Sequence, residues 1–254
     1  MTIIHINAPF NMLLTRIDFV IENKINPEIY LSAWDLDKYG EEEFHSISKI
    51  LKENKLDVTI HAPYMDLSPG GIDQKVKQVT IERFSRVIEI AYHFKPKTIV
   101  FHPGYDKWRF DGNVELWLGS SLKTWEPLVD KAEKNGLLLA IENVFEETPD
   151  SIKSLLDHIH SPNFRFCFDT GHQNLFSKTT LSQWIECLGD YLVEVHLHDN
   201  HKQRDEHLPI GEGGFDFDLF FKLLSIHKIN PIYTIEPHEE AHLWRGLKAL
   251  KKYI

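Results

Sequence analysis

The chain has 254 residues, of which 42% are hydrophobic and 26% are charged, and its net charge is −10 with neutral histidines. No apolar run reaches membrane-spanning length, and the N-terminus has no basic region followed by a long apolar stretch, so we expect neither a membrane protein nor a secretory signal. Cys167 and Cys187 form no CxxC pair, so we expect no disulfide framework and a cytoplasmic location.

The negative charge also disfavours strong binding to nucleic acid, because such binding depends on neutralisation of phosphates by Lys and Arg. It leaves nucleic acid possible as a partner, since a local basic or metal-rich surface can still attract phosphate.

Strand-like and helix-like segments alternate eight times along the chain. The expected strands cover residues 2–7, 27–32, 56–61, 97–102, 137–142, 164–169, 191–197 and 232–236. One expected helix runs from Asp73 to Phe94 and places on one face Val76, Val79, Phe84, Val87, Ile88 and Ala91. The last expected helix repeats apolar residues at Leu243, Trp244, Leu247 and Leu250. Together with the length, this alternation predicts an α/β fold, a (β/α)8 TIM barrel forming a single domain over residues 1–254.

Six of the expected strands end in side chains that bind metals. The segments read TIHAPY, IVFHPG, LAIENV, CFDTGH, EVHLHD and YTIEPH. They deliver, in chain order, His61, His102, Glu142, Asp169 with His172, His196 with His198, and Glu236 with His238. The carboxyl ends of parallel barrel strands meet at one mouth, so these side chains predict a metal site there.

The alternation of side chains along the strands supports the same arrangement. If His61, Glu142 and Asp169 point into the barrel, then Thr59, Ala140 and Cys167 do so as well, and these are small or polar. The opposite face carries the bulky residues Leu139, Ile141, Phe166, Phe168, Val193, Val195, Tyr233 and Ile235.

The motifs HAPY, HPG, EN, DTGH, HLHDN, DEHLPIGEG and IEP, in this order over residues 56–240, resemble the xylose-isomerase-like barrel superfamily. That superfamily holds sugar and sugar-phosphate isomerases and epimerases, and also endonuclease IV. Similarity to the epimerase-like members implies one divalent metal on Glu142, Asp169, His196 and Glu236. His172 would then contact substrate oxygens, and the two glutamates would act as the catalytic base and acid that move a proton.

Similarity to endonuclease IV implies instead three zinc ions on nine ligands. All nine have counterparts here: His61, His102, Glu142, Asp169, His172, His196, Asp205, His207 and Glu236. In that branch Glu142 bridges two metals, while Asp205 and His207 join His172 on the third. Such a site suits hydrolysis of a phosphodiester in nucleic acid or in a small molecule.

The acidic balance and the short loops after the strands lead us to expect a metal-dependent isomerase or epimerase of a sugar or sugar phosphate first. A multi-metal phosphodiesterase is the alternative, and a non-catalytic metal-binding scaffold is a third.

The complete ligand set argues for several metals, so we expect one to three ions, with zinc, cobalt, iron, manganese or magnesium all compatible. Oligomeric state stays open. Substrate contacts are expected from His172, His198, Trp108, Arg109 and Arg204.

Overall fold

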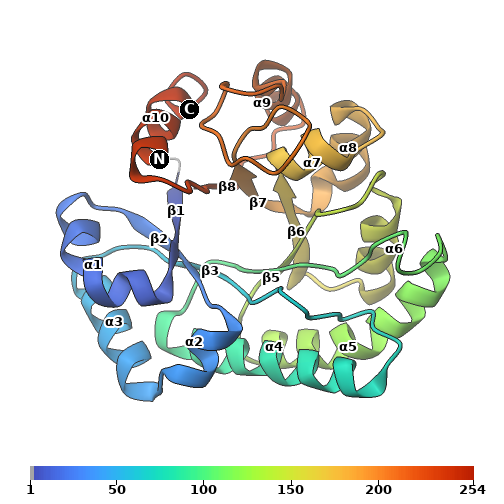
Figure 1. The fold of residues 1–254 in the computed structure, drawn as a ribbon, viewed down its shortest axis with the longest axis horizontal. Helices are drawn as coiled ribbons and strands as arrows, with labels where there is room; N and C mark the ends of the chain where they lie inside the picture. Colours follow the sequence, from blue (N-terminus) through green and yellow to red (C-terminus); the bar gives the residue numbers. More distant parts are fainter. Residues whose placement is uncertain (1–2) are drawn as a thin grey trace.

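A computed structural model describes residues 3–254 of the chain. Its eight strands are all parallel and pair in chain order, and the barrel closes because the last strand pairs with the first (Figure 1). The strands are β1 (Ile4–Pro9), β2 (Asn26–Tyr30), β3 (Thr59–His61), β4 (Ile99–Phe101), β5 (Leu139–Glu142), β6 (Phe164–Asp169), β7 (Leu192–Leu197) and β8 (Ile232–Ile235). The predicted TIM barrel is confirmed, although residue 2 of the first expected strand lies outside the described residues.

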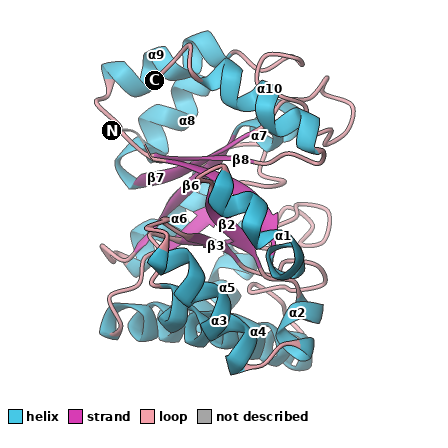
Figure 2. Cartoon of the chain, turned by 90° about the vertical axis from the view of Figure 1, so that its left-hand side faces the viewer, coloured by secondary structure: helices cyan, strands magenta, loops and turns pink. Residues whose placement is uncertain are grey.

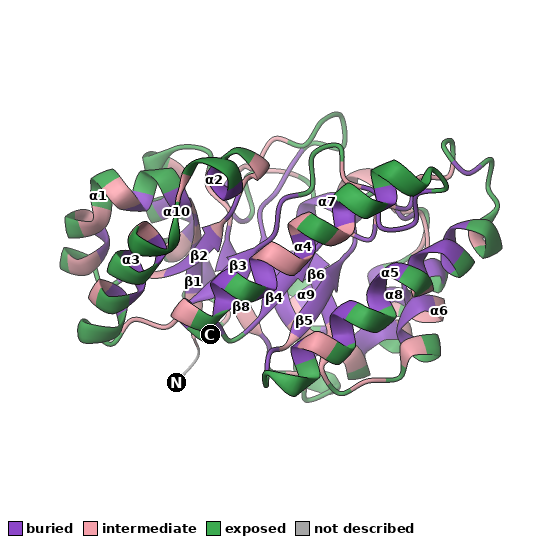
Figure 3. Ribbon diagram, turned by 90° about the horizontal axis from the view of Figure 1, so that it is seen from below, coloured by how far each residue is buried: buried purple, intermediate pink, exposed green. Residues whose placement is uncertain are grey.

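Helices connect the strands and cover the barrel on its outside (Figure 2). They are α1 (Phe10–Glu22), α2 (Ala33–Lys38), α3 (Glu41–Glu53), α4 (Gln74–Phe94), α5 (Val114–Lys134), α6 (Asp150–Ile159), α7 (Thr170–Phe176), α8 (Leu181–Leu188), α9 (Phe217–Ile226) and α10 (Glu240–Leu250), with a 3-10 turn at Gly189–Tyr191. The strands are buried, while the helices expose their outer faces (Figure 3). Within residues 3–254, no helix combines the length and apolarity needed to cross a membrane.

The residues on the two faces of the strands are mostly those expected from the alternation of side chains along each strand. Val100, Ala140 and Cys167 form a small cluster inside the barrel that is separate from the large core between strands and helices. Val193 departs from the expectation, because it packs against this interior cluster. The register between β6 and β7 shifts between Phe166 and Cys167, and this irregularity interrupts the strict alternation there.

The first turns of α4 correct the expected apolar face of that helix. Val76 and Val79 are 41% and 47% exposed, whereas Lys77 and Thr80 are buried. The Thr80 hydroxyl accepts a hydrogen bond from the backbone N–H of Ser68 and donates to the Val76 carbonyl. The start of α4 thus packs against the polar backbone of a loop, and only its later turns pack against apolar side chains.

The segment after β3 is fastened to α5 by buried hydroxyl groups. Ser120 donates to the Gly71 carbonyl at 2.8 Å and Thr124 donates to the Pro69 carbonyl at 2.7 Å. A Cβ atom at Gly70 would lie 2.2 Å from the Trp117 ring, so only glycine allows this close approach. These contacts hold the chain that leaves the barrel mouth next to His61.

Replacing Thr124 with Val should test this attachment, because it removes the hydroxyl and keeps the shape. The Pro69 carbonyl would be left buried without its partner, which should lower the free energy of unfolding by about 1–3 kcal/mol. Urea denaturation measures the change. Thr15 is exposed and donates to Met12, so Thr15→Val is the matched control and should change stability by less than about 0.5 kcal/mol. Equal effects of the two substitutions would contradict the attachment.

Candidate metal centre

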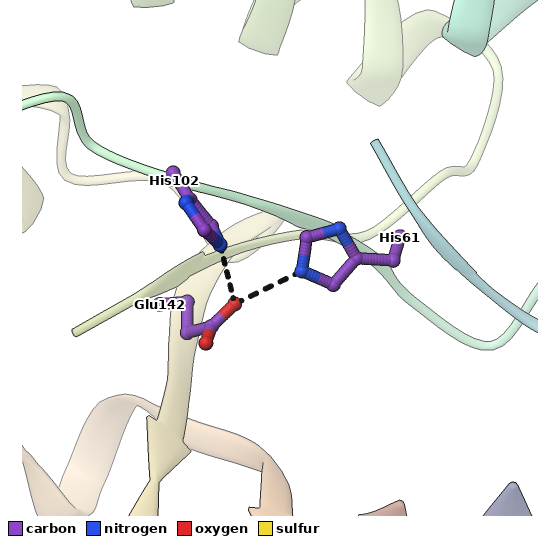
Figure 4. A group of neighbouring side chains, drawn as sticks. All are labelled: His61, His102 and Glu142. Atoms are coloured by element: carbon purple, nitrogen blue, oxygen red, sulfur yellow. Dashed lines mark hydrogen bonds and ion pairs between the residues drawn. The ribbon is translucent and has the colours of Figure 1, made fainter. Parts of the chain in front are cut away.

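Glu142, the last residue of β5, stands at the centre of the barrel mouth and is 1% exposed. Its Oε2 lies 3.1 Å from Nε2 of His61 and 3.2 Å from Nε2 of His102 (Figure 4). Its Oε1 lies 3.1 Å from Nδ1 of His172 and 3.6 Å from Nδ1 of His196. Each oxygen of one buried carboxylate therefore faces its own pair of histidines.

Asp169 ends β6 and begins α7, and it organises the second side of the centre. As the N-cap residue, it accepts the backbone N–H of His172 at 2.6 Å, which fixes the first turn of α7 against the mouth. Asn143 and Asp169 also exchange hydrogen bonds of 2.9 and 3.0 Å, so the ends of β5 and β6 are tied together. His198 donates from Nε2 to Asp169 at 2.9 Å.

His196 on β7 is held from behind by Glu28 on β2. Its Nε2 donates to Glu28 Oε1 at 2.9 Å, and both side chains are fully buried. Its Nδ1 has no hydrogen-bond partner among the described residues, yet it lies 3.4 Å from Glu236 Oε1 and 4.0 Å from Asp169 Oδ2. A buried nitrogen without a partner, turned toward carboxylates, is the geometry expected of a metal ligand whose other nitrogen has an outer partner.

Asp205 and His207 reach the centre from the loop after β7. Nε2 of His207 lies 3.0 Å from Asp205 Oδ2, and Nε2 of His172 lies 3.4 Å from the same oxygen. His207 has a left-handed backbone with φ of 49°, which is uncommon for a non-glycine residue and is typical of strained functional sites. Asp199 holds this loop, since its carboxylate accepts the backbone N–H groups of Gly211, Gly213 and Phe215.

Several histidines have one nitrogen fixed by the protein. His61 donates from Nδ1 to the Ala62 carbonyl at 2.8 Å, His172 from Nδ1 to the Asn143 carbonyl at 3.0 Å, and His207 from Nδ1 to the Glu236 carbonyl at 3.1 Å. Each therefore turns its Nε2 toward a carboxylate of the centre. Fixed tautomers of this kind are typical of metal-ligating histidines.

The charges of these groups depend strongly on one another. Burial opposes the positive charge of His61, but the facing carboxylates of Glu142 and Glu28 raise its pKa to about 9. Burial likewise opposes the charge of His207, while Asp205 and Glu236 raise its pKa to about 9. The pKa of Glu142 is lowered well below its usual range by His102 and His196, in spite of its burial. The Glu142 carboxylate is thus ionised and requires positive charge beside it.

Divalent cations fit this set of residues. His61, His102 and Glu142 bring ligand atoms within 4.8 Å of one another, and so do His61, His196 and Glu236, and also His198, Asp205 and His207. Imidazole nitrogens and carboxylate oxygens are the ligands of zinc and related metals. All nine residues expected from the sequence lie around this one centre, which we call the histidine–carboxylate ring.

The expected substrate contacts divide into two groups. His172 and Arg109 line a cavity of about 410 Å³ above the ring, together with Tyr64, Phe145 and Phe176. Trp108 is 83% exposed beside Lys107, and the Arg204 side chain is 81% exposed beside Glu206, so neither is brought to the cavity.

His198, expected to contact substrate, and His238, expected among the metal-capable side chains, both lie beside His207. His198 is 1% exposed and stacks beneath His207 with ring centroids 3.9 Å apart, so it supports the ring from behind. His238, which follows β8, stacks on the other face of His207 at 4.0 Å. Gly171 makes room for His198, since a Cβ there would lie 2.0 Å from the imidazole.

Sequence reasoning missed four residues that shape the site: Glu28, Tyr64, Asn143 and Asp199. Glu28 lies in the middle of a strand, and its pairing with His196 joins β2 to β7 across the barrel. Asn143 and Asp199 directly follow Glu142 and His198 in the motifs EN and HLHDN, so their position was a usable signal. Tyr64 stacks on His102 with centroids 4.4 Å apart, a contact that needs the fold.

The chain belongs to the xylose isomerase-like TIM barrel family, which it matches over residues 26–253. An uncharacterised protein of Methanocaldococcus jannaschii is 28% identical over 207 residues, which cover 79% of this chain and 71% of that protein. A probable endonuclease 4 of Ureaplasma parvum is 22% identical over 196 residues, which cover 68% of this chain and 63% of that protein. Among solved structures, a D-tagatose 3-epimerase-like protein has a TM-score of 0.85 at 24% identity, covering 98% of this chain and 96% of its own. At that identity the likeness shows the fold alone.

Replacing Glu28 with Gln tests its support of His196. The amide keeps an acceptor but loses the charge, so the affinity for zinc should fall by roughly 10- to 100-fold, as is typical of lost outer-shell partners. Competition with a chelating dye measures it. Glu194→Gln is the matched control: Glu194 is also buried, but burial and the charge of Glu28 raise its pKa to about 7, so it is already partly neutral. Unchanged affinity in Glu28→Gln would contradict the role of Glu28.

Proposed function

We propose that this protein is a multi-metal hydrolase of small phosphoesters, built on the xylose isomerase-like barrel. The sequence led us to expect an isomerase or epimerase first, and we place the hydrolase first on the strength of the geometry around Glu142. The observation that carries the proposal is that the two Glu142 oxygens face different histidines: Oε2 faces Nε2 of His61 and of His102, and Oε1 faces the unpartnered Nδ1 of His196.

A proton-transfer mechanism needs a carboxylate with a free oxygen. On Glu142, Oε2 faces Nε2 of His61 and of His102, while Oε1 faces Nδ1 of His196. If Glu142 helped to hold two cations together with these histidines, its pKa would be depressed and it would be a poor general base. In a single-metal isomerase His61 and His102 would have no cation to hold, whereas in a multi-metal site they would hold one together with Glu142.

The cavity favours a small substrate over a nucleic-acid duplex. Its volume is about 410 Å³, and Arg109 is its one lining Lys or Arg side chain within the described part of the chain. The net charge of −10 also provides little for long-range attraction of a polyanion. A single phosphoryl group, in contrast, could be bound by the ring and one arginine alone.

We assign the following roles to the residues of the site. His61, His102 and Glu142 would hold one cation; Glu142, Asp169, His196 and Glu236 a second; and His172, Asp205 and His207 a third. Bound there, divalent cations supply Lewis acidity that polarises phosphoryl oxygens and activates water. Arg109 would orient the substrate by hydrogen bonds to an anionic oxygen, and Tyr64, Phe145 and Phe176 would exclude bulk water.

A sugar isomerase or epimerase is the second candidate, and one observation favours it. Glu142 and Glu236 both line the cavity above the ring, where two carboxylates could flank a bound sugar. In this case Glu142 and Glu236 would be the base and acid around one metal.

His207→Ala separates the two functions, because His207 would hold a cation only if the ring binds several metals. The metal-loaded variant should hydrolyse bis(p-nitrophenyl) phosphate at least 10- to 100-fold more slowly than the natural protein, measured as kcat/KM. His238→Ala is the control, since His238 stacks on the same imidazole and should leave the rate nearly unchanged.

The proposal is wrong if the fully loaded natural protein hydrolyses no small phosphoester and interconverts ketohexoses instead, with His207→Ala retaining that activity.

A further inference from the structure

A second cavity, of about 540 Å³, opens beside the ring between α1, α10 and the outer face of β1. It shares four residues with the cavity above the ring: His61, Tyr64, His207 and Glu236. A molecule on the ring can therefore extend into it without leaving the protein. We call this space the α1–α10 cavity.

The inner wall of the α1–α10 cavity is aliphatic. It is formed by Ile6, Ala8, Leu13, Val20, Ile25 and Leu243, all of them buried. Ile6 and Ala8 are the β1 side chains that face the helices, so the cavity lies outside the barrel wall and not in its polar interior. Aliphatic walls of this kind leave water without hydrogen-bond partners.

Two contacts join α1 and α10 at the outer side of the cavity. The Phe19 and Trp244 rings meet edge to face at 6.3 Å, and Arg16 forms an ion pair with Glu240 at 3.2 Å. Arg16 also departs from helical geometry, with φ of −125° and ψ of 20°, so α1 bends at this contact. The space behind the bend stays open.

The ionisable side chains of the α1–α10 cavity lie at its edges and not on its aliphatic inner wall. His61, His207 and Glu236 belong to the ring at one side, while Arg16 and Glu240 are paired with each other and more than half exposed at the rim. A charged or strongly polar group deeper in the cavity would lose its water and find aliphatic carbon, which is costly. An alkyl or aryl group would instead gain from burial.

We propose that the α1–α10 cavity binds an apolar substituent of the substrate, while its phosphoryl group lies on the ring. The substrate class is then the phosphoester of an apolar alcohol or phenol, a statement that rests on the proposed function. The apolar binding itself rests only on the cavity.

A series of n-alkylphosphonates tests this assignment without turnover. Binding of methyl-, butyl- and octylphosphonate to the metal-loaded protein is measured by titration calorimetry. Affinity should rise about fourfold for each added methylene until the cavity is filled, corresponding to about 0.8 kcal/mol per buried methylene. Methylphosphonate binding without any gain on lengthening would overturn the proposal and leave the proposed function standing.

Two variants test whether the gain in affinity with chain length arises in the α1–α10 cavity. Met12 lines the cavity from its exposed side, so Met12→Trp should abolish the gain on lengthening and leave methylphosphonate binding unchanged. Ala8→Leu narrows the cavity from the strand and should reduce the gain. Val79→Phe enlarges an exposed side chain of α4 and is the control, which should retain the full gain. An undiminished gain in both cavity variants would overturn the assignment.

1-Octanol, which lacks a phosphoryl group, separates failure of this inference from failure of the proposed function. Octanol binding that Met12→Trp removes supports the cavity even if no phosphonate binds, and in that case the proposed function fails alone. Absence of octanol binding to the natural protein would overturn the cavity assignment.

Discussion

The buried carboxylate of Glu142 is the constraint around which the barrel mouth is built. An ionised group with 1% exposure is stable only if positive charge or hydrogen-bond donors surround it. Four histidines from β3, β7, the segment after β4 and the first turn of α7 meet this requirement. Because these elements come from distant parts of the chain, the barrel must close correctly before the carboxylate is compensated. The same arrangement supports the proposal that the ring holds several divalent cations.

The barrel interior below the ring has been adapted to support it. A TIM barrel usually fills this space with layers of branched apolar side chains. Here Glu28 and Glu194 are fully buried, with Asn7 donating to Glu28 and Thr234 to Glu194. His5 is also buried without a hydrogen-bond partner among residues 3–254, and burial lowers its pKa to about 4. Stability must therefore come from the large apolar core between strands and helices, which leaves the interior free to orient His196.

The sequence was sufficient to predict the fold and the nine residues of the ring. It was less informative about the side chains that surround the ring. Strand ends such as LAIENV, CFDTGH and EVHLHD carry their metal-capable side chains at fixed register, so Glu142, Asp169 and His196 could be placed together without coordinates. Trp108 and Arg204 could not be placed, because nothing in a sequence tells whether a loop side chain turns inward. Val76 and Val79 satisfied helical periodicity but faced solvent, since hydroxyl groups such as Thr80 bind a loop there. The pairing of Glu28 with His196 spans the barrel and needs the closed fold.

The number of divalent cations that each chain retains tests the central claim most directly. Elemental analysis of the purified protein, after loading with zinc and removal of free metal, gives this stoichiometry. A bridged centre on Glu142 with a third position at His172, Asp205 and His207 predicts a value near three per chain. A value near one, unchanged by replacement of His207, would contradict the account and restore the isomerase as the leading function.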